Sequence, residues 1–421
     1  MEKFTKWSDP ASGVNPFVPP RFRWCGLNTP TVLCPFRILL GVALVMLRFL
    51  LLLAAAGLYL VLWILVRAPV MVGIGTIMYQ QGCDLKISGA VAGYGVLMGV
   101  FPWSARLAHR VIDKVLLGAL LYLGLGLAAR EKPADLRRMG LQPPARKGQA
   151  AAKAASPPKL CAGWTSGDLV LCNHTSFIEV LWLAHRLSPE FAILDYIPAV
   201  EESPAQVTVR TGGVLAALWH AVRLPIVPTP KKGGMSLQEA SKKAQSKRKP
   251  LVVFPEVARS NGDAVLLFGP GLLEGLSKQS NGNSREENGL DMTLVPRSHL
   301  LGFSYPLGSF SLAHPVGSTF SKVLKTCYQL RTEMTVVHVS SKDVPGFPGR
   351  TNSPNAGTKS VIKTPAAWVK TIRELMAQCA SRPLVSLSVA DYASFWEYWS
   401  LLKKDKKAAA KLADLRSKKL A

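Results

Sequence analysis

A histidine and a carboxylate lie five residues apart in the segment 173–179 (NHTSFIE). The residues before it predict a strand that ends at Cys172, and those after it predict a helix that begins at Ser176. His174 would then lie where a strand gives way to a helix, a position from which side chains project into a cleft. Glu179 could hold one ring nitrogen and leave the other as a base near neutral pH. The segment thus predicts a general base that deprotonates a hydroxyl for direct attack on an acyl carbonyl.

The same residues also fit a structural interpretation. Ser176 and Glu179 form the S-x-x-E pattern of a capping box, in which the carboxylate satisfies an amide at the helix N-terminus. A single histidine in a turn is usually just a surface residue. Taken alone, the segment leaves the catalytic and the structural interpretation open.

A second polar cluster, 254–262 (FPEVARSNG), follows another strongly apolar segment. If the two preceding strands are parallel, both clusters emerge at the same edge of the sheet. Arg259 carries a planar guanidinium that suits a phosphate, and Glu256 could hold Arg259 or accept a hydrogen bond from a glycerol hydroxyl. The alternative is an ordinary exposed loop with a local ion pair.

Short apolar runs alternate with amphipathic stretches from residue 167 onward, which predicts an α/β layer architecture. The predicted strands are 168–172, 191–194, 224–227, 251–254 and 334–339, and the predicted helices are 176–187, 207–222, 236–245 and 365–379.

The most apolar segment, 38–66, contains one charge, Arg48, and its last 18 residues contain none. A helix of that length spans roughly 27 Å, close to the thickness of the hydrocarbon core of a bilayer. We expect a bilayer-inserted helix with Arg48 near one interface. A second apolar run, 115–129, is short for a crossing, so a re-entrant or interfacial helix and a second span are both open.

The 421 residues carry a net charge of +25, which implies an anionic partner. Segments 130–153, 231–249 and 403–421 supply +17 of this charge. These segments lack interleaved aromatic residues and the chain has no nucleic-acid motif, so an anionic lipid surface is favoured over nucleic acid. Solvated loops are the remaining alternative. The pair Lys418–Lys419 resembles a dilysine retrieval signal of the endoplasmic reticulum, although the tail is rich in lysine in any case.

Composition excludes other classes. Apolar residues make up 48% and charged residues 18%, which excludes a disordered chain. The seven cysteines have irregular spacing, which argues against a disulfide scaffold and a structural zinc site. No set of His, Cys and Asp residues implies a metal.

Together, the two clusters are more specific than either alone. H-x4-E, followed about 75 residues later by F-P-E-x-x-R-S, resembles the H-x4-D and F-P-E-G-T-R-S motifs of PlsC-type glycerolipid acyltransferases. The resemblance covers roughly residues 167–306. The opening MEKFTKW, with NPF at 15–17 and Asn261-Gly262, is also similar to fungal lysophosphatidate:acyl-CoA acyltransferases.

The resemblance implies a mixed sheet with flanking helices and transfer of an acyl group from acyl-CoA to lysophosphatidic acid. His174 would be the general base and Glu179 its orienting carboxylate. The lysolipid would be bound by Glu256, Arg259, Ser260 and Gly262. Acyl-CoA would be a co-substrate, with no metal or other cofactor; membrane lipids and the lysophospholipid would be the other partners.

The predicted organisation has four parts. Residues 1–130 would anchor the protein in the membrane, 131–160 would form a basic Ala/Pro-rich linker, 161–390 the acyltransferase domain, and 391–421 an aromatic and then basic tail. The expected location is the membrane of the endoplasmic reticulum, with lipid droplets as a second location and the catalytic domain in the cytosol.

Three residues depart from the motifs. Glu179 is one methylene longer than the family's Asp, and Val257-Ala258 replace Gly-Thr, which removes a residue that readily adopts positive φ. Segments 223–228 and 303–306 match the family's remaining motifs weakly. Two other functions therefore stay open: acylation of a different lysophospholipid, and a catalytically weak membrane adaptor in vacuolar protein sorting.

Overall fold

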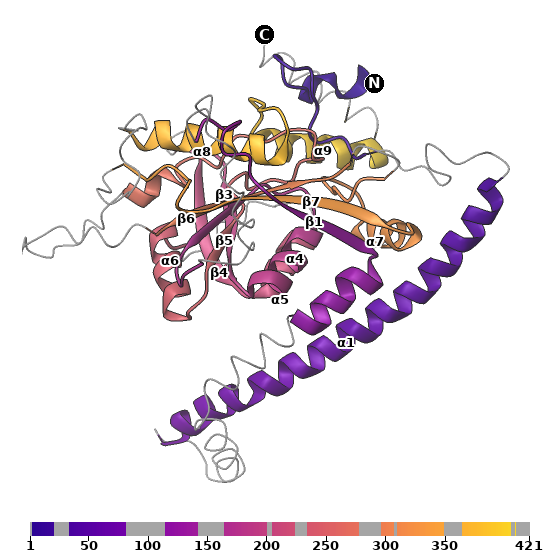
Figure 1. Ribbon diagram of the computed structural model, residues 1–421, viewed down its shortest axis with the longest axis horizontal. Coiled ribbons are helices and arrows are strands. Elements are labelled where there is room, and N and C mark those ends of the chain that lie inside the picture. Colours follow the sequence, from indigo (N-terminus) through magenta and orange to yellow (C-terminus); the bar gives the residue numbers. More distant parts are fainter. Residues whose placement is uncertain are drawn as a thin grey trace, which may run out of the picture.

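The computed structural model describes residues 2–20, 33–80, 114–141, 164–199, 204–223, 234–277, 296–306, 310–348, 364–405 and 409. Within them, a mixed seven-stranded sheet lies between helices on its two faces, which confirms the α/β class (Figure 1). In chain order the strands are β1 (Leu127–Pro133), β2 (Leu169–Cys172), β3 (Glu190–Ile197), β4 (Gln206–Gly212), β5 (Leu251–Val253), β6 (Ser298–Ser304) and β7 (Thr332–Val339).

The spatial order of the strands is β1-β7-β6-β2-β5-β3-β4. The four central strands β6, β2, β5 and β3 are parallel to one another, β7 and β4 run antiparallel to them, and β1 is parallel to β7. The carboxyl ends of β2, β5 and β6 therefore meet at one edge of the sheet. This is the condition under which the two polar clusters come together.

Helices cover both faces of the sheet. They are α4 (Phe177–Leu187), α5 (Val214–Val222), α6 (Leu237–Ser246), α7 (Thr319–Tyr328), α8 (Pro365–Ala380) and α9 (Val389–Lys404). Alternate residues of each strand enter opposite cores, because side chains alternate across a strand. Leu169 and Leu171 pack with residues of α6, α8 and α9, whereas Val170 and Cys172 pack with α4 and α5. Burial on both faces explains the continuous apolar runs of β2 and β5.

The prediction of one helix over 207–222 is wrong in its first half. Gln206–Gly212 forms β4, which pairs antiparallel with β3, and α5 begins only at Val214. The β-branched residues of QVTVRTG favour a strand, and Arg210 on β4 forms an ion pair with Asp195 on β3 (Nε to Oδ2, 2.6 Å). No element was predicted from the sequence for β1, β6, α7 or α9. The predicted strand 224–227 lies outside the described residues.

The N-terminal apolar segment forms the long helix α1 (Cys34–Gln80). Among the described residues, only Cys34–Val61 of this helix is long and apolar enough to cross a membrane. The second apolar run is not a crossing, because it divides between a short helix, Lys114–Gly124, whose last turn is π-helical, and strand β1.

Helix α1 is attached along one side to the α/β domain (Figure 1). Arg48 donates hydrogen bonds to the carbonyls of Cys327 (3.2 Å), Gln329 and Leu330 (2.9 Å), at the C-terminal end of α7, where a cation is favoured. Gly41 contacts the ring of Tyr328 so closely that a Cβ would clash with it. The partners of Arg48 are thus protein carbonyls, which the sequence did not predict.

The predicted boundaries differ from the structure in three places. Residues 4–18, predicted to belong to the anchoring region, pack against α9 on the other side of the sheet from α1 (Figure 1). The predicted linker begins inside β1, and its residues 142–160 lie outside the described residues. The predicted tail begins inside α9, which buries Phe395 and Tyr398.

Cys34 forms a disulfide that the irregular spacing of the cysteines did not predict.

Candidate active site

His174 and Glu179 form a buried pair at the carboxyl end of β2. Ser176 caps α4 through its hydroxyl, which accepts from the amide of Ile178, and this brings Glu179 into the first turn. His174 Nδ1 lies 3.0 Å from Glu179 Oε2. Glu179 also accepts from the amide of Thr175, directly before the cap, so the carboxylate has both the structural and the imidazole-binding role.

Four donor groups converge on the Glu179 carboxylate. Besides the imidazole, they are the amide of Thr175 (2.9 Å to Oε2), the Thr175 hydroxyl, and the hydroxyl of Tyr305 (2.8 Å to Oε1). Burial and the Glu179 charge raise the pKa of Tyr305, so its hydroxyl remains a donor. This set compensates for burying a charge and holds the longer glutamate side chain in place.

The imidazole of His174 is arranged as a neutral base. A carboxylate accepts hydrogen bonds, so Nδ1 carries the proton and Nε2 has the free lone pair. Burial lowers the pKa of His174, which outweighs the opposite effect of Glu179. The ring of Phe254 stacks on the imidazole, with 4.2 Å between ring centroids. The imidazole of His174 is therefore neutral at neutral pH, with Glu179 binding its edge and Phe254 packing on its face.

Glu256 has a different position from the one expected. Its carboxylate accepts from the amide of His174 (3.2 Å) and the amide of Leu266 (2.9 Å), and the side chain is fully buried. Burial raises the pKa of Glu256 to about 8. No ion pair joins it to Arg259 in the described part of the chain. Glu256 thus ties the His174 turn to the loop after β5.

Arg259 is a buried cation without hydrogen-bond partners at its tip. The side chain is 1% exposed, and both terminal nitrogens lack a partner among the described residues. Burial lowers the pKa of Arg259, and the neighbouring Tyr392 partly opposes this effect. The charge of Arg259 adds to the burial that lowers the pKa of His174, so the guanidinium and the imidazole act on each other within one site.

The rest of the second cluster shapes the loop. The Ser260 amide donates to the carbonyl of His174 (3.1 Å), which joins the two clusters directly. Gly262 adopts φ +83° beside Thr175 and Tyr305. Val257 adopts φ +60°, a left-handed conformation that is strained for a β-branched residue. This is the position at which the resembling motif has glycine.

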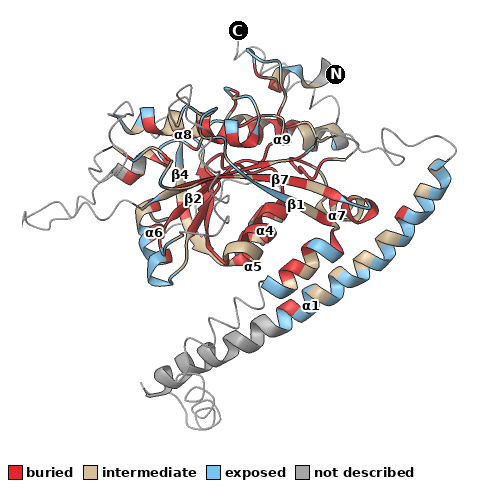
Figure 2. Cartoon of the chain, in the orientation of Figure 1, coloured by how far each residue is buried: buried red, intermediate tan, exposed pale blue. Residues whose placement is uncertain are grey.

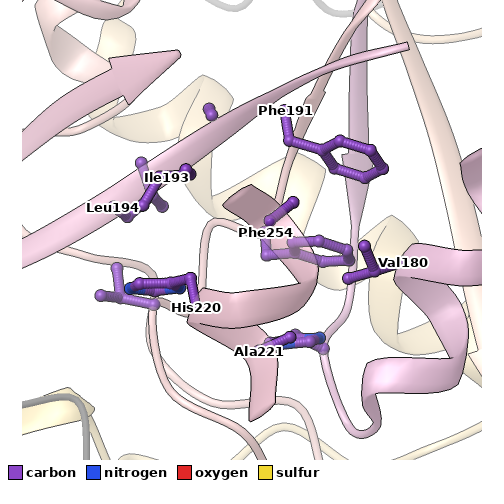
Figure 3. Close-up of a pocket in the computed structure, with 11 residues that line it drawn as sticks. Val180, Phe191, Ile193, Leu194, His220, Ala221 and Phe254 are labelled. Atoms are coloured by element: carbon purple, nitrogen blue, oxygen red, sulfur yellow. The ribbon is translucent and has the colours of Figure 1, made fainter. Parts of the chain in front are cut away.

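A small cavity of about 30 Å³ adjoins His174. In Figure 3, Phe191, Val180 and Phe254 lie on one side of it, and Ile193, Leu194 and His220 on the other. Burial lowers the pKa of His220 to about 4, so this second imidazole is neutral as well. Arg259 does not line this cavity. The site therefore offers an apolar side beside the base and, separately, a buried cation.

Four residues of the site were not singled out from the sequence as site residues: Thr175, Tyr305, His220 and Tyr392. Tyr305 follows β6, the strand on the other side of β2 from β5, so strand order was the missing information. The side-chain amide of Asn173 pairs with the backbone of Phe303 (2.7 and 3.0 Å) and holds β6 beside the His174 turn. An amide residue next to His174 was thus a local feature of the sequence that is linked to β6. Comparison with protein-family models, curated proteins and solved structures finds no match for the chain.

Proposed function

We propose that this protein is a membrane-bound acyltransferase that moves an acyl group from acyl-CoA to lysophosphatidic acid. The observation that carries the proposal is a buried His–Glu pair together with a buried arginine, on the loop bonded to the His174 turn, whose terminal nitrogens have no partner among the described residues. The first supplies a base for a hydroxyl, and the second a site for a phosphate. For the fold, we propose the PlsC type, supported by the two motif segments following the adjacent parallel strands β2 and β5.

The reaction needs only one proton carrier. Nε2 of His174 takes the proton of the free hydroxyl of the lysolipid, and the oxygen attacks the thioester carbonyl carbon. The tetrahedral intermediate then collapses, the C–S bond breaks, and the CoA thiolate takes the proton from the imidazolium. Glu179 keeps Nδ1 protonated throughout and stabilises the transient positive charge on the ring. The products are phosphatidic acid and CoA.

Arg259 fits a phosphate acceptor. A buried charge without a partner is costly, and an anion with several oxygens would satisfy both terminal nitrogens. A zwitterionic choline headgroup would place a cation near this guanidinium. We therefore favour lysophosphatidic acid over lysophosphatidylcholine as the acceptor.

Membrane association is supported by α1, whose described residues are largely exposed (Figure 2). Many of them are large and apolar, such as Leu39 (69% exposed), Met46 (66%) and Leu50 (65%), whose spacing places them on one side of the helix. Trp219 on α5 (71%) and Phe320 on α7 (61%) are exposed as well. Because Arg48 attaches α1 along the domain, we propose that α1 lies within one leaflet, with the domain at the membrane surface.

Within the cell, we propose the endoplasmic reticulum membrane, with the catalytic domain in the cytosol and lipid droplets as a second location. Lys418–Lys419, on which the retrieval signal rests, lies outside the described residues. Imaging of the full chain with and without the substitution of both lysines tests this assignment.

The purified full chain in detergent micelles should form phosphatidic acid from acyl-CoA and lysophosphatidic acid. His174→Ala should reduce turnover by about 10²–10⁴, as expected for loss of a general base, with membrane association unchanged. His185→Ala, in the last turn of the helix α4 that follows the His174 turn, is the matched control and should retain activity. Wild-type activity in the His174 variant would refute the assigned mechanism. Absence of transfer by the wild-type protein would favour the adaptor.

A further inference from the structure

The N-terminal segment 4–18, here called the strap, is docked firmly on the α/β domain. Trp7 and Phe17 are fully buried, and their rings pack against Phe395 of α9 with centroid distances of 5.7 Å. Asp9 accepts from the amide and hydroxyl of Ser386 (2.8 and 2.6 Å). A segment held by buried aromatic rings and a buried carboxylate is part of the domain, not a loose terminus.

One end of the strap is bonded to the loop that carries Arg259. The amide of Asn261 donates to the carbonyl of Pro16 (2.6 Å), and its side-chain Nδ2 donates to the carbonyls of Asn15 (3.0 Å) and Val18 (3.1 Å). A single residue thus makes three hydrogen bonds to the strap. Only Ser260 separates it from Arg259, so these bonds restrain the position of the Arg259 backbone.

A second contact reaches the Arg259 side chain. Phe17 packs on Tyr392, with 5.6 Å between ring centroids. The Tyr392 hydroxyl donates to the carbonyl of Pro315 (2.7 Å), which fixes the ring, and the Tyr392 side chain lies within hydrogen-bonding range of the Arg259 side chain. The strap therefore supports Arg259 both through its loop and through Tyr392, whose side chain interacts with the guanidinium.

We propose that the strap positions Arg259 for the phosphate of the acceptor, with Asn261 and Tyr392 as the positioning residues. The inference rests on the proposed function, because it assigns the strap to the acceptor site. Its physical basis is that the terminal nitrogens of this buried guanidinium make no hydrogen bonds within the described part of the chain, so its loop and Tyr392 must orient it before the phosphate binds.

Asn261→Ala removes two of the three bonds to the strap and should raise the KM for lysophosphatidic acid on the order of tenfold, the effect of losing about 1.4 kcal/mol. The kcat, the KM for acyl-CoA and the acid limb of the pH profile should change little, because His174 and Glu179 are untouched. Ser394→Ala, which removes the bond from Trp7 at the far end of the strap, is the matched control. Phe17→Ala should behave as Asn261→Ala does, and Phe17→Leu should restore most of the affinity.

Binding of a water-soluble short-chain lysophosphatidic acid, measured beside the matching lysophosphatidylcholine, separates the possible failures. Binding without acyl transfer by the wild-type protein overturns the proposed function but leaves the strap inference standing if Asn261→Ala weakens binding of the phosphate ligand alone. Unchanged binding in Asn261→Ala and Phe17→Ala overturns the inference, as does equal weakening for both lysolipids. If Asn261→Ala does not fold, Tyr392→Phe and Phe17→Ala decide by the same comparison, with Phe17→Leu as the variant that should stay near wild type.

Discussion

At Val257 we expect a glycine variant to be more stable than an alanine variant, the reverse of the usual order. The φ of Val257, +60°, is left-handed, and its side chain is buried. The backbone of an L-residue in this region costs roughly 1–2 kcal/mol relative to its right-handed conformation, and glycine escapes this cost. The perturbation is the pair Val257→Ala and Val257→Gly, compared with each other, so that loss of the valine methyl groups is common to both.

The expected free energies of unfolding follow from opposing contributions. Both variants lose the two valine methyl groups, about 0.8 kcal/mol for each, plus the effect of any cavity. Glycine additionally loses about 0.5–1 kcal/mol through its flexible unfolded state and gains about 1–2 kcal/mol by relieving the left-handed strain. We therefore expect Val257→Gly to be more stable than Val257→Ala by up to about 1.5 kcal/mol.

The control is the adjacent residue, Ala258, which is fully buried and is not among the residues with positive φ. Ala258→Gly should lose about 1 kcal/mol or more, the ordinary direction. Urea unfolding of the full chain in micelles, followed by tryptophan fluorescence, gives the midpoints at a shared slope. A glycine variant at residue 257 that is less stable than the alanine variant by the same margin as at residue 258 would contradict the strain argument.

Three further outcomes follow from the site and from the α1 contact. Because burial keeps the pKa of His174 below 6.5, kcat/KM should begin to fall with decreasing pH only below that value. Glu179→Gln removes a carboxylate that raises this pKa, so it should move the fall in kcat/KM to lower pH and slow turnover. Tyr305→Phe removes one of four donors to Glu179 and should reduce kcat on the order of tenfold, with the KM values near wild type; a changed KM with unchanged kcat would argue against a role at the base. Arg48→Met should lower the free energy of unfolding by about 1–3 kcal/mol, because it leaves carbonyls at the end of α7 without this partner. Leu50→Met, at an exposed position of α1, is the control and should have little effect. Equal urea midpoints for the two variants would show that the Arg48 contact does not stabilise the domain.

Local sequence patterns were enough to predict several elements. The run DLVLC predicted β2, and the amphipathic stretch after Ser176 predicted α4, because strand and helix periodicities are properties of neighbouring residues. The same patterns placed His174 at the end of a strand and Glu179 in a first helical turn, which is where the structure has them. The prediction failed at 207–222, where two apolar stretches with different periods were merged into one helix.

The partners of the polar residues could not be predicted from local patterns. Glu256 was expected to hold Arg259 or to accept a hydrogen bond from a glycerol hydroxyl, yet it binds amides 82 and 10 residues away. No protein partner was predicted for Arg48, which binds carbonyls about 280 residues away. These choices depend on which strands and helices become neighbours, and charge and residue type alone do not contain that information.

By itself, the sequence determined the residue types available for chemistry, the apolar helix and the alternation of strands and helices, since these depend on short-range periodicity and composition. The tertiary structure alone decided that Tyr305 would join Glu179, that Arg259 would be buried with its terminal nitrogens unsatisfied, and that residues 4–18 would lie against the loop that carries it. The physical reason is that burial and hydrogen-bond partners are set by the strand order β6-β2-β5 and by packing across the sheet, which bring together residues more than 200 positions apart.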